Sequence, residues 1–148
     1  MAKAVFNGGL NAAKPVHDAA KTGPYGDKTE PFVTLKRAED TGPDDLLESD
    51  GYIFVGPENL AALSGEMKAF LDRCYYPVLG KIEGRPYVHL VCAGSDGKNA
   101  VRQLARIVTG WRLKAVQEPL IVNTAAQTED EILALKVIGE ADLDKCRE

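Results

Sequence analysis

The feature that most constrains the fold is the stretch of residues 50–77, which predicts a strand followed closely by a helix. Residues 52–55 are aromatic and β-branched and are bounded by glycines, which is typical of a strand buried on both faces. A polar loop comes next, and Ser64 is then in position to cap a helix. Apolar residues recur in that helix at helical spacing: Met67, Phe70, Leu71 and Cys74. This is a βα unit, and ligands of open α/β sheets bind where such strands end, so residues 56–63 are the first candidate site.

A second βα unit follows in residues 85–110. Residues 87–93 are almost uniformly apolar and predict another buried strand. The segment from about Lys98 to Gly110 predicts a helix with its apolar residues on one side. We expect Arg102 and Arg106 to lie on its solvated side.

The remaining elements are expected to complete the same alternation. Residues 113–116 and 120–123 predict a fifth strand that is interrupted at Pro119, because proline cannot donate to a ladder. Thr128 and Glu131 form a capping box. It predicts one last helix, which directs three apolar side chains toward the sheet: Ile132, Leu135 and Ile138.

The N-terminal third gives weaker signals. Residues 3–6 and 32–35 predict the first and second strands, and a short helix is expected between Pro15 and Lys21. Residues 44–48 predict a short helix or turn. Alternating strands and helices indicate one α/β domain over residues 1–148, with a parallel sheet and helices on both faces.

Composition excludes several classes of function. The net charge of −4 and the pI near 5.3 argue against a nucleic-acid partner, since such proteins concentrate Lys and Arg. No apolar run has the length of a membrane span, and the N-terminus lacks the apolar region of a signal peptide, so we expect a cytoplasmic protein. Cys74, Cys92 and Cys146 show no pairing that would indicate a disulfide framework or a metal site.

Two segments give the chain a family resemblance. Residues 54–59 have the sequence Phe-Val-Gly-Pro-Glu-Asn, with Ser-Gly-Glu-Met-Lys-Ala-Phe-Leu-Asp-Arg at residues 64–73. Together with residues 93–104, they resemble the flavodoxin-like, FMN-binding NAD(P)H oxidoreductases. The resemblance covers residues 44–113. It implies a three-layer sandwich with a five-stranded parallel sheet of order 2-1-3-4-5, and FMN as the cofactor with NAD(P)H as a possible electron donor.

The resemblance also implies site residues. Two loops would border the flavin ring: Pro57, Glu58, Asn59, Leu60 and Ala61 in one, and Gly94, Ser95, Asp96 and Gly97 in the other. The loop after the first strand would bind the FMN phosphate with these residues: Gly8, Gly9, Leu10, Asn11 and Ala12. No catalytic side chain is expected, because the redox chemistry belongs to the cofactor. The expected activity is electron transfer from NAD(P)H to a quinone, a flavin or another small acceptor.

The predicted phosphate loop departs from the family pattern. Residues 7–13 contain no Ser or Thr, whereas the family typically places several hydroxyl side chains there. Two alternatives therefore stay open: a flavodoxin-like binding module that has lost FMN, and a flavodoxin that carries single electrons between proteins. A homodimer is also expected from the resemblance, with Tyr75, Tyr76 and Trp111 exposed.

Overall fold

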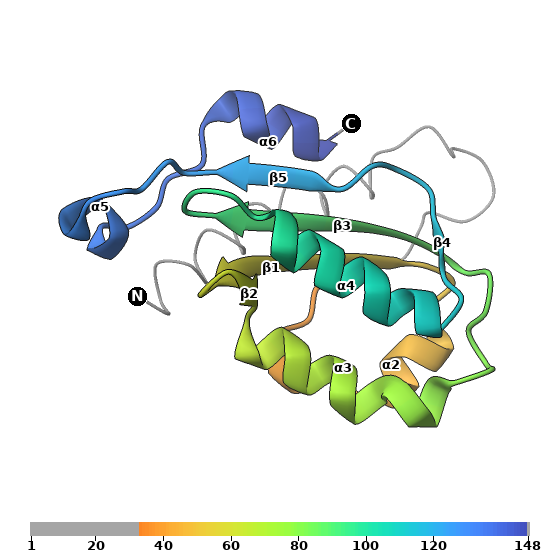
Figure 1. Ribbon diagram of the computed structural model, residues 1–148. Coiled ribbons are helices and arrows are strands. Elements are labelled where there is room, and N and C mark those ends of the chain that lie inside the picture. Colours follow the sequence, from red (N-terminus) through yellow and green to blue (C-terminus); the bar gives the residue numbers. More distant parts are fainter. Residues whose placement is uncertain (1–32, 148) are drawn as a thin grey trace.

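The computed structural model describes residues 33–147, which form one sheet with helices on both faces (Figure 1). The sheet has five strands: β1 (Tyr52–Asn59), β2 (Ala62–Leu63), β3 (Pro86–Ala93), β4 (Lys114–Ala115) and β5 (Leu120–Asn123). The central strand β3 is parallel to β1 and, along its other edge, to β4 and β5. Strand β2 is antiparallel to the end of β1.

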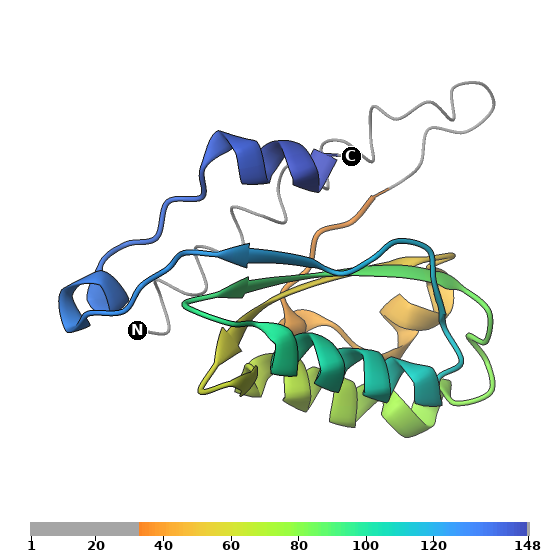
Figure 2. The same ribbon diagram turned by 45° about the horizontal axis from the view of Figure 1, so that its top comes forward.

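Two long helices pack against one face of this sheet and a shorter helix against the other. The helices are η1 (Ala38–Asp40), α2 (Pro43–Glu48), α3 (Gly65–Val78), α4 (Lys98–Gly110), α5 (Glu129–Leu133) and α6 (Glu140–Arg147). In Figure 2, α3 and α4 lie together below the sheet and α6 lies above it. Among the helices of the described residues, none combines the length and apolar character that crossing a membrane requires.

The main core lies between the sheet and the pair α3 and α4. The aromatic ring of Phe54 contacts Phe70 of α3 and Tyr87 of β3, with ring centroids 6.4 and 6.1 Å apart. Trp111, at the end of α4, is completely buried and donates its indole N–H to the Tyr75 carbonyl over 3.1 Å. The expectation that Trp111 is exposed was therefore wrong: its ring stacks on the half-buried Tyr75.

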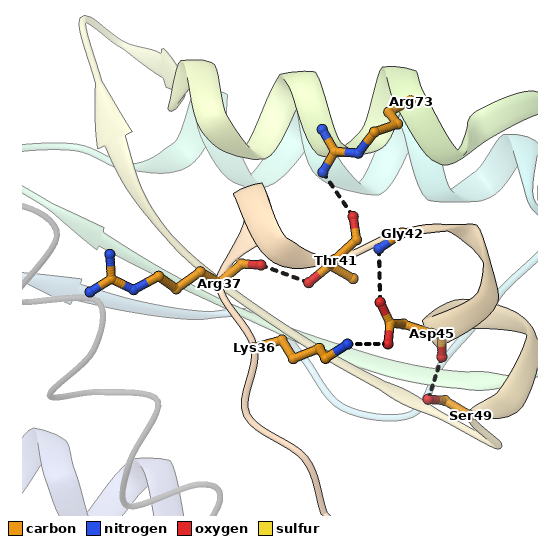
Figure 3. A network of polar contacts seen from close by, with 7 residues as sticks. All are labelled: Lys36, Arg37, Thr41, Gly42, Asp45, Ser49 and Arg73. Atoms are coloured by element: carbon orange, nitrogen blue, oxygen red, sulfur yellow. Dashed lines mark hydrogen bonds and ion pairs between the residues drawn. The ribbon is translucent and has the colours of Figure 1, made fainter.

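A network of polar contacts attaches the segment before β1 to helix α3 (Figure 3). Arg73 of α3 donates to the carbonyls of Ala38 and Thr41 over 2.6 and 2.8 Å. Asp45 accepts from the Gly42 backbone N–H over 2.8 Å and pairs with Lys36 over 2.5 Å. These contacts lower the pKa of the Asp45 carboxyl, the bond from Gly42 having the larger effect. The segment is thus fixed before the chain enters the sheet.

The α/β sandwich predicted from the sequence is confirmed, with two differences inside it. Residues 33–35 form no strand, so the predicted second strand is wrong in its described part, and the antiparallel strand β2 was not predicted. The predicted strand at residues 3–6 and the helix after it lie outside the described residues. The order of the strands β1, β3 and β5 is the predicted order of the third, fourth and fifth strands.

The predicted last helix is wrong, because the structure divides it into α5 and α6. The capping box of Thr128 and Glu131 does open α5, as predicted. Helix α5 then ends at Leu133, where the Lys136 ammonium donates to the Ile132 and Ala134 carbonyls over 3.2 and 3.0 Å. Leu135 is 67% exposed instead of packed against the sheet, whereas Ile138 is buried as expected.

The buried histidine of β3 should make stability depend on pH. Burial lowers the pKa of His89, and its Nε2 has no hydrogen-bond partner within the described part of the chain. As pH falls below about 6.5, the unfolded chain takes up a proton that the folded chain resists, so the free energy of unfolding should fall by up to ~1.4 kcal/mol per pH unit. Urea unfolding between about pH 7 and 5 measures this slope. His89→Phe, which keeps a ring against Tyr87, should reduce it; an equal slope in both proteins would contradict the assignment.

Candidate functional site

The candidate site lies where the parallel strands end. The arrowheads of β1, β3 and β5 point to the same edge of the sheet (Figure 1), so the segments that follow these strands meet there. The sequence pattern predicts a loop over residues 56–63. The structure instead continues β1 through Pro57 to Asn59, turns at Leu60 and Ala61, and returns in β2. We call residues 58–63 the β1–β2 hairpin.

The turn of this hairpin has an unfavourable backbone conformation. Leu60 and Ala61 have φ angles of 51° and 59°, in the left-handed region that glycine and asparagine tolerate best. The Leu60 side chain is 89% exposed. The turn of the hairpin therefore leaves an apolar side chain exposed to solvent at the end of the sheet.

The second predicted loop, residues 94–97 between β3 and α4, is in direct contact with the hairpin. Gly97 caps α4 with a φ of 78°, and its backbone N–H donates to the Glu58 carboxylate over 3.0 Å. A Cβ atom at Gly97 would lie 2.8 Å from Ile121 and 3.1 Å from Ala93, so only glycine fits. The structure thus brings together the two loops that the sequence assigned to one site, and Glu58 joins them.

Helix α4 also contacts the hairpin through two amide side chains. Asn99 donates to the Ala61 carbonyl over 2.5 Å, and the Gln103 side-chain carbonyl accepts from the Leu63 backbone N–H over 2.9 Å. Arg102 donates to the other amide atom of Asn99, its Oδ1, over 2.7 Å. The sequence pattern does not indicate that Asn99 and Gln103 contact the hairpin. The signal available in the sequence was a pair of amide side chains four residues apart, directly after a predicted site loop.

The end of β5 supports the β3–α4 loop from the other side. Asn123 donates to the Ser95 carbonyl and accepts from the Ala125 backbone N–H over 2.8 Å. The Thr124 backbone N–H donates to the Ala93 carbonyl over 2.9 Å. Asn123 was not predicted to take part either, although it ends a predicted strand.

A separate hollow of about 360 Å³ lies beyond β5, between that strand, α5 and the link to α6. It is on the opposite side of β3 from the β1–β2 hairpin. Its charged side chains already have partners: Glu131 accepts from the Gln127 and Thr128 backbone N–H groups over 2.9 Å, and Asp142 pairs with Lys145 over 2.8 Å. These contacts support local structure, so we do not assign a ligand to this hollow.

Not every predicted site residue can be placed. Five lie outside the described residues: Gly8, Gly9, Leu10, Asn11 and Ala12. Pro57 lies within β1, opposite Cys92 of β3, and Asp96 accepts from the Lys98 backbone N–H over 3.2 Å. Residues 33–147 contain no group of three or more His, Cys, Asp or Glu that could bind a metal ion.

Relieving the strained turn of the hairpin should stabilise the protein. The double variant Leu60→Asn and Ala61→Gly introduces the pair best suited to a two-residue hairpin turn. Because each left-handed residue costs about 1 kcal/mol, we expect ~1–2 kcal/mol of stabilisation. Thermal unfolding by circular dichroism measures the gain. An unchanged or lower Tm would mean that the turn carries no such strain.

Solved structures define the fold class. The flavodoxin of Streptococcus pneumonia TIGR4 superposes with a TM-score of 0.70 at 18% identity, over 94% of this chain and 84% of that chain. An NAD(P)H:quinone oxidoreductase from Methanothermobacter marburgensis gives 0.56 at 15% identity, over 94% and 88%. An NADPH-quinone reductase from P. pentosaceus gives 0.52 at 17% identity, over 90% and 86%. The fold is flavodoxin-like.

The sequence also matches a family within that class. Residues 28–127 match the family described as NADPH-dependent FMN reductase, and the chain belongs to it. The match includes both the β1–β2 hairpin and the β3–α4 loop, and it excludes residues 8–12. The resemblance found in the sequence is thus confirmed, and family membership supports FMN as the cofactor. A comparison with curated proteins gives no match.

Proposed function

We propose that this chain is an FMN-dependent oxidoreductase that passes electrons from NAD(P)H to a small acceptor, with a quinone as the first candidate. The observation that carries the proposal is the 3.0 Å bond from Gly97 to Glu58, which unites the two loops of the candidate site at the carboxyl edge of the sheet. The family match over both loops supports FMN, and the family's name supports NADPH as donor.

The residues present fit the ring of such a cofactor. The nearest atom to a Cβ built on Gly94 is the Ala126 carbonyl oxygen, 3.8 Å away, so no side chain of the described residues crowds the backbone at Gly94. The exposed Leu60 side chain offers an apolar surface on which a flat ring can lie. FMN, when bound, supplies the redox chemistry. The protein's part is to bind the ring, orient it and exclude water from one side of it.

The proposal also specifies the class of electron acceptor, the oligomeric state and the location of the protein. Two similar structures are described as quinone reductases and a third as an azoreductase, which together favour an aromatic electron acceptor. We also propose a homodimer and a cytoplasmic location, where NAD(P)H is available. Of the three aromatic side chains expected at a dimer interface, Tyr76 is strongly exposed, with an exposed fraction of 80%.

Anaerobic reduction of the FMN-loaded protein tests the proposed activity. NADPH or NADH should bleach the visible flavin absorbance, and a benzoquinone should restore it over many cycles. If dithionite bleaches the bound flavin while neither nucleotide does, the oxidoreductase proposal fails. That result would favour the flavodoxin that carries single electrons.

A binding module without cofactor is the second candidate. It is favoured by the predicted phosphate loop, residues 7–13, which has no hydroxyl side chain and lies outside the family match. Each lost hydrogen bond to a charged phosphate would weaken FMN by about 1.5–3 kcal/mol. Failure of FMN to bind the wild-type protein, with binding restored by Ser and Thr in this loop, would establish the second candidate.

A further inference from the structure

We propose that Asn99 and Gln103 of α4 are positioning residues that fix the β1–β2 hairpin in the geometry that binds the flavin ring. The inference rests on the proposed function, since it concerns the same site. It assigns the position of the hairpin to a pair of amide side chains on a helix.

The hairpin needs support from outside itself. Strand β2 is only two residues long, and its pairing with β1 consists of Glu58 opposite Leu63 and Asn59 opposite Ala62. A two-stranded hairpin is marginally stable by itself. The left-handed backbone of Leu60 and Ala61 weakens it further.

The two amides supply this support by pairing with the free edge of β2. The carbonyl of Ala61 and the N–H of Leu63 are two residues apart, so they point to the same side of an extended chain. Asn99 donates to the first over 2.5 Å, and Gln103 accepts from the second over 2.9 Å. Four residues apart on α4, the two side chains lie on one helix face. They therefore present one donor and one acceptor, as a neighbouring strand would.

The orientation of the Asn99 amide is fixed as well. Arg102 donates to its Oδ1 over 2.7 Å, so the amide nitrogen is directed toward the Ala61 carbonyl. At the other end of the hairpin, Glu58 accepts from Gly97, which caps the same helix. The hairpin is thus attached to α4 at three points, and a displacement of its turn would displace Leu60 and the ring that contacts it.

The two amides have opposite roles, and this allows a matched test. Asn99→Asp replaces a donor with a carboxylate, which cannot donate to the Ala61 carbonyl. Gln103→Glu keeps an acceptor for the Leu63 N–H, whereas Gln103→Ala removes it. Both acidic variants add the same charge. Repulsion of the anionic cofactor by the added net charge would act in the same direction at both positions, whereas only Asn99→Asp loses the proposed contact with the hairpin.

FMN titration of these variants gives the first readout. Asn99→Asp and Gln103→Ala should each weaken FMN at least about tenfold, because a hydrogen bond to the hairpin is lost. Gln103→Glu should recover most of the affinity that Gln103→Ala loses. Arg106→Ala, an exposed change on the same helix, is the neutral control. Equal losses in Asn99→Asp and Gln103→Glu, or no loss in Asn99→Asp, would overturn the proposal.

Amide hydrogen exchange without FMN gives the second readout and separates the positioning of the hairpin from the binding of FMN. The Leu63 amide should exchange about tenfold faster in Gln103→Ala and recover in Gln103→Glu. If the wild-type protein bound no FMN while these changes were seen, the amides would still fix the hairpin, and only the proposed function would fail. Unchanged exchange in every variant would overturn the positioning role itself.

Discussion

Replacement of Gly97 by alanine is expected to destabilise the protein by about 2–4 kcal/mol and to abolish measurable FMN binding. The φ of 78° at this position is unfavourable for alanine. The added Cβ would also lie 2.8 Å from Ile121 and 3.1 Å from Ala93, closer than such atoms approach. Relief of both problems would move the Gly97 N–H away from Glu58 and separate the two loops of the site. Urea unfolding and FMN titration measure the two losses.

Gly65→Ala is the matched control for this variant. Gly65 opens α3, has nothing within 4 Å of a built Cβ and does not have a positive φ. Alanine in that first turn should leave stability within about 0.5 kcal/mol and leave FMN affinity unchanged. If Gly97→Ala behaved like Gly65→Ala, the described geometry of the β3–α4 loop would be incorrect.

Replacement of Trp111 by alanine should cost about 3–5 kcal/mol, the largest effect expected of a single core side chain here. The indole is completely buried, stacks on Tyr75 with ring centroids 5.8 Å apart and donates to the Tyr75 carbonyl. Its removal leaves a cavity between α3 and α4 and an unsatisfied carbonyl. Because Trp111 is the only tryptophan in the chain, circular dichroism should follow the unfolding.

Two further substitutions separate the contributions of the tryptophan. Trp111→Phe keeps a ring against Tyr75 and loses the indole hydrogen bond, so it should cost less than Trp111→Ala. Tyr76→Ala, next in sequence to Tyr75 and 80% exposed, should change monomer stability by less than about 0.5 kcal/mol. A small loss in Trp111→Ala would contradict the burial of the indole.

The strands β1 and β3 and the helices α3 and α4 were predictable because their burial requires a regular pattern of apolar residues in the sequence. The apolar runs that became β1 and β3 are flanked by glycines and proline, and both neighbouring helices carry clear apolar faces. The predicted bounds of α4, Lys98 to Gly110, are those observed. The spacing of apolar residues is therefore sufficient to predict these strands and helices.

The errors occur where tertiary contacts decided the local structure. A turn of Leu60 and Ala61 lacks the glycine or asparagine that identifies a hairpin, so β2 was missed. Trp111 gives no sequence signal of its hydrogen bond to Tyr75, which comes from another helix. At the end of α5, the ammonium group of Lys136 bonds back to the Ile132 carbonyl, a contact that the sequence pattern does not reveal. Periodicity alone predicted that the helix continues.

The resemblance predicted which loops form the candidate site but not the side chains that support them, and the role of these loops in flavin binding stays a prediction. Family resemblance assigned the segments that contain Glu58 and Gly97, and the structure joins those two residues. The roles of Asn99, Gln103 and Asn123 depend on which backbone groups face them after folding. The spacing of residues in the sequence does not predict these contacts, because the partners are 28 to 40 residues away.

Titration of the purified protein with FMN, followed by flavin fluorescence and Tm together, tests the central claim most directly. We expect saturable quenching and a matching rise of Tm, because a ligand that binds only the folded state must stabilise it. Both responses should be lost in Gly97→Ala and retained in Gly65→Ala. If excess FMN gives neither quenching nor a rise of Tm in the wild-type protein, the chain does not bind FMN and the proposed function is wrong.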